Sequence, residues 1–457
     1  MREHDPMTDP TPQPDDATVP GAPSQPVPVE QPTPEPAPAE QPTPEPAPAE
    51  QPTPEPAPAG HAPAGATRST WRTVQHATGW CVAVVISLLA CLSLAPDLLG
   101  FLSDDLRLSL RYPFAQAVAL RSGAVVVLVL VGLVVAVSAL TRVLRHEGGR
   151  RTGVIALVLL LVAGAHTGVL WGRGLDTTDI LAASAPAAAE EAWDGNLTVL
   201  AFNTYAGRAS MVELAIAIRQ STPDVVVLPE THAGDAADLL TLLEQDGLSY
   251  RPFVSEDETD STSASAEASA SPTPTASPTP TSSSTSTGFD GDPGATTVLV
   301  SASIGDYEQV TAPDGLGHGA VLLQPVGDAM LNGHQRPTIL GVHTVAPLKS
   351  TMRAWEESVR QAVAQCASPA TGLILAGDLN ATVDHALMQD LGGCSDAALE
   401  AGAGGLSTWP ASTRTPLLGA AIDHVLVDTA TWTSTGVELV EITGSDHRAL
   451  LVTLAQD

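Results

Sequence analysis

Three apolar stretches limit what this 457-residue chain can fold into more than any other feature does. They lie near Val74–Ala95, Val118–Leu140 and Val154–Trp171. Each is close to the ~20 residues that an α-helix needs to cross the hydrocarbon layer of a membrane. A cleaved signal peptide is a poorer explanation, because the first stretch lies far from the N-terminus and two more follow it. We therefore expect three transmembrane helices, within residues 71–173.

Basic residues indicate how these helices are oriented. Arg68 precedes the first stretch together with Arg72, and four arginines crowd the short loop between the second stretch and the third: Arg142, Arg145, Arg150 and Arg151. Because cytoplasmic loops of membrane proteins are rich in Lys and Arg, both segments belong in the cytoplasm. We expect a multi-pass protein of the cell membrane with a cytoplasmic N-terminus and an extracellular C-terminal domain.

Two polar side chains in these stretches are expected to be structural. His166 would face a neighbouring helix, because a polar group in lipid is costly. Arg121, near the outer end of the second stretch, would extend to the lipid–water interface. Neither needs a role in chemistry.

Two low-complexity segments cannot take part in a packed core. Residues 1–70 are rich in Pro, Ala and Glu, and the unit EQPTPEPAPA runs three times from Glu30 to Ala59. This composition is typical of a disordered, partly polyproline II tail. A Ser/Thr/Pro-rich insertion at about 255–290 is likewise expected to be disordered. With a linker of small residues at 174–192, residues 193–457 remain for the folded domain.

The C-terminal domain alternates predicted strands and helices, which indicates an α/β fold. The predicted helices are Met211–Gln220, Ala236–Gln245 and Met352–Cys366. The predicted strands are Asn196–Phe202, Asp224–Leu228, Thr296–Ser301, Ala320–Gln324, Thr338–His343, Leu373–Ala376, His424–Val427 and Ala449–Leu454.

The acidic balance of the chain bears on its partners. The chain has 51 acidic and 20 basic residues, which give a formal charge of −31 at pH 7. Binding of duplex nucleic acid depends on clustered Lys and Arg that displace counterions from the phosphates. The composition therefore disfavours duplex nucleic acid as a partner.

The four cysteines fall into two pairs. Cys81 and Cys91 lie in the first apolar stretch, whereas Cys366 and Cys394 lie in the C-terminal domain. Neither pair has the CxxC spacing of a metal site. In an oxidising compartment Cys366 and Cys394 would form a disulfide that closes a loop of about 28 residues and contributes roughly 3 kcal/mol. The alternative is that they are two unrelated small apolar residues.

Carboxylates, amides and imidazoles stand where predicted strands end or begin. Glu230 ends the apolar run VVVLPE, Asp378 and Asn380 follow a strand in ILAGDLNAT, and His343 closes TILGVH. Others stand near the end of the chain in IDH and GSDH: Asp423, Asp446 and His447. Oxygen ligands suit a hard cation such as Mg²⁺, or Mn²⁺ in its place, and a histidine beside a carboxylate suits acid–base chemistry near neutral pH. The set predicts metal-assisted hydrolysis at phosphorus.

The order of these motifs resembles the endonuclease/exonuclease/phosphatase superfamily. The motifs are LAFNT, LPET, VHTVAP, GDLN, IDH and GSDH, and together they extend over most of the C-terminal domain. The resemblance implies a four-layer α/β sandwich of two β-sheets flanked by helices. It also implies an Mg²⁺-dependent phosphoric ester hydrolase.

The resemblance implies a metal site of three residues. Glu230 would be the principal metal ligand, Asn203 in LAFNT would lie beside it, and Asp446 would lie in or near the metal shell. In LPET the residue before the glutamate is Pro229, where the commoner pattern has a glutamine.

The resemblance also implies roles for five residues around the metal. His447 would act as general base on the attacking water and Asp423 would orient it. Asp378 and Asn380 would position the nucleophile and the phosphate, and His343 would donate to a phosphate oxygen. Whether Asp378 rather than His447 is the general base stays open.

Structural alternatives exist for several of these residues. Asp378 and Asn380 can form a simple Asx turn, Asp423 can cap a backbone amide, and Trp409 in STWP either lines the pocket or is a half-buried structural side chain. Residues expected only to pack or to face solvent are His232, His318, His385 and His424.

These observations predict a membrane-anchored, metal-dependent phosphoesterase that acts outside the cytoplasm. Its substrate would be a phosphodiester or a phosphomonoester, with lipid head groups and nucleotides as candidates, and we expect a monomer. One alternative is a surface nuclease for small or single-stranded nucleic acid. Another is a catalytically silent binding protein of the cell envelope that keeps the fold.

Overall fold

The structure is a computed structural model that describes residues 65–183, 193–255 and 295–456. The Pro-rich repeats, the Ser/Thr/Pro-rich insertion and the second half of the expected linker lie outside the described residues. Within them, the C-terminal domain contains two mixed six-stranded β-sheets and a two-stranded ribbon.

The first sheet has the strand order β13-β14-β1-β2-β4-β3. Strand β1 runs parallel to β2 and antiparallel to β14. The bounds are β1 (Leu197–Ala201), β2 (Val225–Leu228), β3 (Tyr250–Val254), β4 (Thr297–Ser301), β13 (Trp432–Glu441) and β14 (Arg448–Gln456).

The second sheet has the strand order β11-β12-β10-β9-β6-β5. Strand β9 runs parallel to β10, which is antiparallel to β12. The bounds are β5 (Tyr307–Val310), β6 (Gly319–Pro325), β9 (Thr338–His343), β10 (Leu373–Asp378), β11 (Cys394–Asp396) and β12 (Asp423–Asp428), and the ribbon consists of β7 (Met330–Leu331) and β8 (His334–Gln335).

The two sheets pack face to face around the main core. Successive side chains of a strand point to opposite faces of its sheet, and β1 shows the consequence: Val199 and Ala201 belong to the core between the sheets, whereas Leu200 belongs to an outer cluster. The second sheet supplies Ile339, Ile374 and other residues to the central core. Because this central layer is largely apolar, a shift of one residue would turn apolar side chains outward, so burial specifies the register of both sheets.

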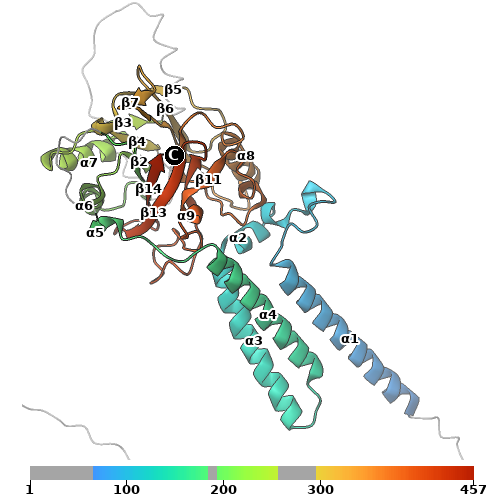
Figure 1. The fold of residues 1–457 in the computed structure, drawn as a ribbon. Helices are drawn as coiled ribbons and strands as arrows, with labels where there is room; N and C mark the ends of the chain where they lie inside the picture. Colours follow the sequence, from blue (N-terminus) through green and yellow to red (C-terminus); the bar gives the residue numbers. More distant parts are fainter. Residues whose placement is uncertain (1–64, 184–192, 256–294, 457) are drawn as a thin grey trace, which may run out of the picture. The chain divides into compact units, whose positions relative to one another are not determined.

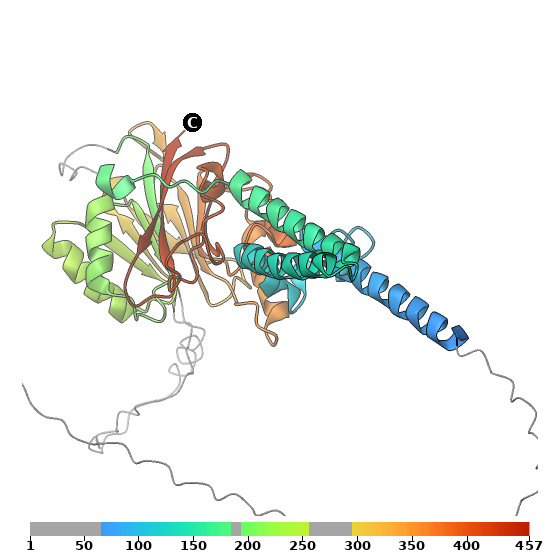
Figure 2. The ribbon, with the colours of Figure 1, turned by 90° about the horizontal axis from the view of Figure 1, so that it is seen from below.

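Helices cover the outer face of each sheet. Helices α6 (Met211–Ser221) and α7 (Ala233–Gln245) pack on the first sheet, and α8 (Met352–Ala364) packs on the second. In α8 the side chains of Trp355, Val359 and Ala362 form the buried stripe of an amphipathic helix. Figures 1 and 2 show α6 and α7, in yellow-green, on the outer side of the first sheet. The predicted α/β fold of two sheets flanked by helices is confirmed.

The described residues contain two helices long and apolar enough to cross a membrane, α3 (Arg121–Leu144) and α4 (Arg150–Gly172). Among the residues of α1 (Gly65–Leu92) whose side chains the structure describes, the apolar stretch is Ala77–Leu92, which spans ~24 Å of the ~30 Å hydrocarbon layer. The prediction of three spans is therefore corrected to two candidate spans. The predicted first span extended to Ala95, beyond the end of the helix at Leu92, and Pro96 follows shortly after.

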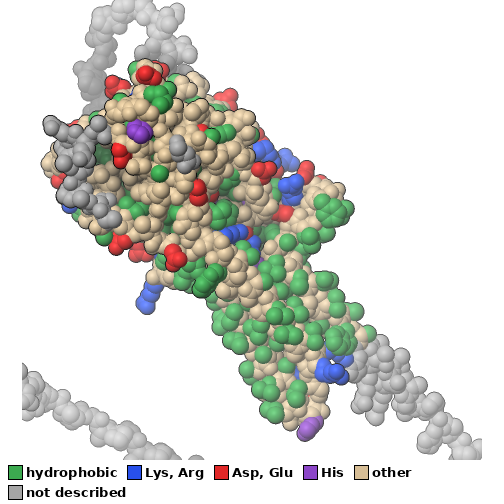
Figure 3. Space-filling model, viewed as in Figure 1, with side chains coloured by type: hydrophobic (Ala, Val, Ile, Leu, Met, Phe, Trp, Pro, Cys, Tyr) green, Lys and Arg blue, Asp and Glu red, His purple; other side chains and the backbone are tan. Residues whose placement is uncertain are grey.

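Helices α3 and α4 are not core helices. In the most apolar segment of each helix, only 11% of α3 and 28% of α4 is buried inside the molecule. Figure 3 shows hydrophobic side chains gathered over this helical part of the molecule. An apolar surface of this extent is typical of contact with a membrane or a partner.

Arg121 does not extend toward solvent. It is buried at the start of α3, and its Nε donates to Oδ2 of Asp384 at 2.9 Å. Arg173, directly after α4, donates to the same oxygen at 2.9 Å, and Nη1 of Arg121 lies 2.9 Å from Nδ1 of His166. The expectation for Arg121 was wrong because a carboxylate of the C-terminal domain neutralises it.

Cys366 and Cys394 form a disulfide. It joins the chain just after α8 to the first residue of β11, across a separation of 28 residues. The predicted pairing is confirmed.

The remaining described helices are short. They are η1 (Asp104–Leu106), η2 (Leu108–Leu110), α2 (Phe114–Ala119), α5 (Ile180–Ala183), η3 (Ala302–Ile304), η4 (Ala386–Met388) and α9 (Ala397–Glu400). Of these, η1, η2 and α2 connect α1 to α3, and η2 and α2 contact loops of the C-terminal domain.

Candidate active site

Three strands of the second sheet bring polar side chains together at one edge of the sandwich. His343 is the last residue of β9, Asp378 is the last of β10 and Asp423 is the first of β12. Asp378 is the register partner of both His343 and Asp423. Because β9 and β10 are parallel and β12 is antiparallel to them, two strands end and one begins at this edge.

The first sheet contributes at the same edge. The parallel strands β1 and β2 end two residues before Asn203 and Glu230, and the antiparallel strand β14 begins directly after His447. Both sheets therefore place their polar residues at the same edge of the sandwich, the active-site mouth. The predicted site residues from both sheets meet there.

Asn203 joins two carboxylates across this mouth. Its Nδ2 lies 3.1 Å from Oε1 of Glu230 and 3.1 Å from Oδ2 of Asp378, and it donates to both. Its Oδ1 accepts a hydrogen bond from the backbone of Tyr205 at 2.9 Å, which fixes the amide. Asn203 thereby connects a residue of the first sheet to a residue of the second.

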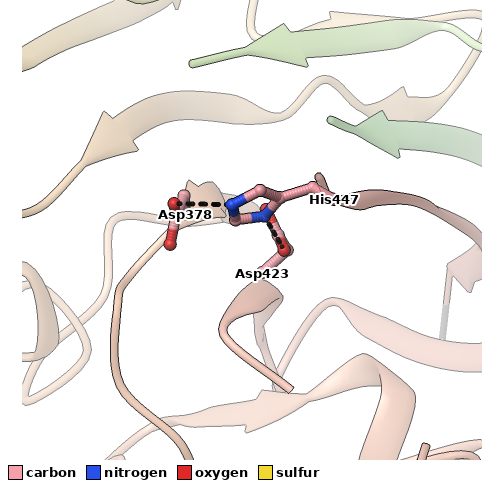
Figure 4. A group of neighbouring side chains, drawn as sticks. All are labelled: Asp378, Asp423 and His447. Atoms are coloured by element: carbon pink, nitrogen blue, oxygen red, sulfur yellow. Dashed lines mark hydrogen bonds and ion pairs between the residues drawn. The ribbon is translucent and has the colours of Figure 1, made fainter. Parts of the chain in front are cut away.

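His447 lies between two carboxylates (Figure 4). Its Nδ1 is 2.8 Å from Oδ2 of Asp423, and its Nε2 is 3.7 Å from Oδ2 of Asp378. Asp446 adds a third carboxylate, with Oδ1 at 4.0 Å from Nε2. The bond to Asp423 fixes the ring plane and leaves Nε2 facing the mouth.

The charges of this cluster shift its proton equilibria. Burial raises the pKa of Asp378 to about 7, and the negative charge of Asp423 adds to the shift. Burial lowers the pKa of His447, but Asp423 and the other carboxylates outweigh it and raise the pKa to about 10. Burial also raises the pKa of Glu230. The surrounding carboxylates therefore favour the protonated form of His447, and burial favours the neutral form of Asp378.

His343 is a neutral imidazole at the same mouth. Burial, together with the positive charges of His318 and His447, lowers its pKa to about 3. Its Nε2 lies 3.8 Å from Oε1 of Glu230 and 3.8 Å from Oδ2 of Asp378, whereas its Nδ1 is buried without a hydrogen-bond partner. A neutral imidazole here can donate one N–H to an anionic ligand.

Gly377, directly before Asp378, allows two strands to approach closely. It lies inside β10 with φ +139°, and a Cβ at this position would lie 2.0 Å from the carbonyl oxygen of Val342. A side chain is thus excluded by the close approach of β9 and β10. The glycine of GDLN lets β10 place Asp378 against His343.

Two site residues have a left-handed backbone. The φ of Glu230 is +58° and that of Asn380 is +47°, a region that non-glycine residues seldom occupy. Each follows the end of a buried strand, and Asn380 is held by hydrogen bonds from its backbone to Oδ1 of Asp378 and from its side chain to the carbonyl of Thr344. Strain of this kind persists where surrounding contacts fix the chain, often at functional sites.

The loop that contains STWP positions two carboxylates of the site. The indole of Trp409 donates to Oδ2 of Asp446 at 3.0 Å, and the hydroxyl of Thr408 accepts from the backbone of Asp423 at 3.2 Å. Trp409 is half-buried. Thr408 gave no signal in the sequence, and Trp409 gave only that of an aromatic residue near the end of the domain.

The other histidines differ in their surroundings. His424 is buried, with Nδ1 at 2.5 Å from Asp396 and Nε2 at 2.8 Å from the carbonyl of Ala381, so it is a packing residue as expected. His385 is also buried. His318 is exposed, but its ring centroid lies 5.0 Å from that of His343, so it adjoins the site instead of facing only solvent.

The donor set fits a divalent cation. One ligand atom each from Asp378, Asp423 and His447 lie within 4.8 Å of one another, a spacing that can hold a metal ion. Oδ1 of Asp446 and Oδ1 of Asp423 are buried without a hydrogen-bond partner, and unpaired buried carboxylate oxygens are costly unless a cation or a proton satisfies them. Oxygen-rich sites of this kind favour hard cations.

Comparison with known proteins agrees with this geometry. The family model described as "Endonuclease/Exonuclease/phosphatase family" matches residues 200–447, more than half of the chain. No curated protein matches the sequence.

Similar solved structures include a humanized D. rerio TDP2 with 14 mutations (16% identity, TM-score 0.40, covering 57% of this chain and 99% of that one). An endonuclease/exonuclease/phosphatase protein from Beutenbergia cavernae is 18% identical (TM-score 0.39, 57% of this chain, 72% of that one). The catalytic domain of human Nocturnin is 15% identical (TM-score 0.38, 58% and 97%). On the strength of the family match, this chain belongs to the endonuclease/exonuclease/phosphatase family.

Proposed function

We propose that the protein is a metal-dependent phosphoesterase, anchored in a membrane by α3 and α4, that hydrolyses phosphodiester or phosphomonoester bonds on the extracytoplasmic side. The observation that carries the catalytic part is the convergence of Glu230, Asp378 and His447 from two different sheets on one mouth. Separate surface acids would not be joined by a single buried amide, as Glu230 and Asp378 are by Asn203.

Glu230 and Asp446 are the proposed metal ligands, with Asn203 aligning Glu230. They are preferred to the trio Asp378, Asp423 and His447, whose spacing also fits an ion, because a protonated His447 cannot donate to a metal. Both carboxylates face the mouth, and Oδ1 of Asp446 has no hydrogen-bond partner. A bound Mg²⁺ or Mn²⁺ would act as a Lewis acid on the phosphoryl oxygens. The neutral His343 and the side chain of Asn380 are the proposed donors to the phosphate.

Asp378 and His447 are the proposed proton-transfer pair. The raised pKa of Asp378 suits it to take a proton from the attacking water. Protonated His447, held by Asp423, then donates its Nε2 proton to the leaving oxygen as the bond from phosphorus to that oxygen breaks. Of the two assignments that the sequence left open, the charges of the site favour Asp378 as the base.

A change of leaving group tests this division. p-Nitrophenolate leaves without a proton, whereas an alkoxide needs one. We expect His447→Ala to slow an alkyl phosphodiester far more than bis(p-nitrophenyl) phosphate, and Asp378→Asn to slow both equally. Equal losses for both substrates in His447→Ala would instead identify His447 as the base.

The overall proposal is tested with the full chain in detergent. We expect turnover of bis(p-nitrophenyl) phosphate with Mg²⁺ or Mn²⁺, none with EDTA, and none in Glu230→Gln. Calorimetry should show weaker Mg²⁺ binding in Glu230→Gln than in the wild type. Absence of turnover on diesters, monoesters and nucleotides, with intact Mg²⁺ binding, would favour a silent binding protein.

The membrane part rests on the exposure of two long apolar helices. The loop between them carries basic residues: Arg142, Arg145, Arg150 and Arg151. By the positive-inside rule this loop is cytoplasmic, so the opposite ends of α3 and α4 are extracytoplasmic. Arg121 and Arg173 stand at those ends and bind Asp384 of the C-terminal domain.

A further inference from the structure

We propose that the C-terminal domain is seated with its active-site mouth on the surface of the bilayer, through exposed leucines on the loops that carry the site residues. The inference rests on the proposed function, because it takes α3 and α4 as membrane-embedded and the mouth as the active site. The proposed occupant of this surface is the lipid bilayer itself.

The loops at the mouth are the ones that contact the outer ends of the apolar helices. Asp384 lies in the loop after β10. Its side chain accepts hydrogen bonds from Arg121 of α3 and from Arg173, which follows α4. Asp384 is six residues after Asp378. The membrane helices are thus joined to the domain at its catalytic edge and not at the far end.

A second loop makes the same connection. The hydroxyl of Ser122, in the first turn of α3, accepts a hydrogen bond from the backbone N–H of Gly419 at 3.0 Å and donates to its carbonyl at 3.2 Å. Gly419 precedes Asp423 by four residues. The residues next to Gly419 therefore lie level with the first turn of α3, where its apolar stretch begins.

A third loop lies beside α2. Gln116 of α2 donates to the carbonyl of Pro347, four residues after His343. The backbone of Ala386 also donates to the hydroxyl of Ser109 at 3.0 Å. The segment that connects α1 to α3 is consequently fastened to two loops of the mouth.

Large apolar side chains are exposed next to these contacts. Leu417 is 47% exposed and Leu418 is 38% exposed, immediately before Gly419, and Leu348 is 61% exposed, immediately after Pro347. The connecting segment adds further exposed side chains: Leu98, Leu99, Phe101, Leu102 and Phe114. Single exposed leucines need no explanation, but these leucines stand on two loops, of which one contacts the first turn of α3 through Gly419 and the other contacts α2 through Pro347.

The position of these leucines beside α2 and α3 indicates that lipid covers them. Leucines level with the start of a transmembrane helix reach the boundary between head groups and acyl chains, where apolar side chains of peripheral proteins insert. Seated in this way, the mouth would receive phosphate esters presented in the plane of the bilayer. Glu230, Asp378 and His447 would then act on head groups without extraction of the lipid into water.

The seating is tested by fluorescence of the full chain in phosphatidylcholine nanodiscs with or without brominated acyl chains. Leu418→Trp and Leu348→Trp are compared with Val326→Trp. Val326 is 47% exposed and follows β6 at the end remote from His343. After subtraction of the wild-type signal, we expect the added emission of the two leucine replacements to be quenched by bromine and that of Val326→Trp to be unaffected. An unquenched Leu418→Trp, or equal quenching of all three, would overturn the seating.

Activity gives a second readout. In the double variant Leu417→Ser/Leu418→Ser, turnover of a phosphodiester lipid in nanodiscs should fall by about tenfold, equivalent to roughly 1.4 kcal/mol, whereas turnover of soluble bis(p-nitrophenyl) phosphate should not change. Equal turnover of the lipid by variant and wild type would count against the seating. A wild type inactive on both substrates would refute the proposed function, and the quenching pattern would still decide where the mouth lies.

Discussion

His447 and His424 show that one pair of side-chain types can have two roles within a single domain. Both are buried beside an aspartate, at 2.8 Å from Asp423 and 2.5 Å from Asp396 respectively. His424 uses both ring nitrogens, because its Nε2 also bonds to a backbone carbonyl. His447 keeps Nε2 directed at the mouth. Of these two histidines, therefore, His447 is the one that can exchange a proton with a ligand.

These two pairs give a matched test at the residue scale. Asp423→Asn removes the carboxylate that orients His447, and we expect kcat to fall roughly 100- to 10,000-fold, with a larger loss for an alkyl diester than for bis(p-nitrophenyl) phosphate. Asp396→Asn removes the equivalent partner of His424. It should lower the melting temperature and leave the activity of the folded fraction nearly unchanged. Equal loss of activity in both variants would show that Asp423 is structural.

The sequence identified the residues that stand where strands end or begin, left two roles open for Trp409, and missed Thr408. Glu230 and Asp378 were found because an apolar run stops at each of them. Thr408 and Trp409 reach the site from a loop with no such pattern. Arg121 and Asp384 are 263 residues apart in the chain, and no local pattern reports a contact over that separation.

At the scale of elements, the strands of the two six-stranded sheets that the sequence did not predict are the edge strands β3, β5, β11 and β13. The two short strands of the ribbon, β7 and β8, were not predicted either. An edge strand is less buried, so its apolar pattern is weaker: β3 contains Pro252, β5 contains Glu308 and Gln309, and β13 has a register shift between Ser434 and Gly436. The interior strands, buried on both faces, were predicted to within a few residues.

The disulfide joins the end of α8 to the edge strand β11. An edge strand is held by backbone hydrogen bonds to one neighbouring strand only, so the covalent link to the end of α8 provides a second attachment for β11. We expect Cys366→Ser/Cys394→Ser to lower the free energy of unfolding by roughly 3 kcal/mol, as measured by chemical denaturation. In the oxidised, denatured wild type, a thiol titration should find only Cys81 and Cys91 free. Four free thiols would exclude the bond.

At the scale of the whole molecule, Asp384 holds the apolar helices to the catalytic domain. Burial raises the pKa of Asp384, but the hydrogen bonds and charges of Arg173 and Arg121 outweigh this and lower it to about 2. The unfolded-state pKa is about 3.9, so the stabilisation is present above that pH and disappears as the pH falls through the folded value. We expect wild type to be more stable than Asp384→Asn by roughly 2 to 3 kcal/mol at pH 5, and the difference to shrink toward pH 2. A difference independent of pH would show that the carboxylate is not charged in the folded protein.

The correction from three spans to two does not alter the expected side of the catalytic domain. In the proposed topology α3 and α4 form a membrane hairpin, so the chain before Arg121 and the chain after Arg173 would lie on the same side of the membrane. The basic loop between the helices would lie on the other side, and α1 would decide only the side of the N-terminal tail.

A reporter fused after Asp457 measures the side of the catalytic domain directly. Alkaline phosphatase folds only in an oxidising compartment, and green fluorescent protein exported unfolded does not fluoresce there. We expect an active phosphatase fusion and a dark fluorescent fusion. Replacement of the four loop arginines by Asn should weaken this orientation, because by the positive-inside rule they are the charges that would hold the hairpin loop in the cytoplasm. A fluorescent C-terminal fusion in the wild type would place the catalytic domain in the cytoplasm, and the Cys366–Cys394 bond would then have no oxidising compartment in which to form.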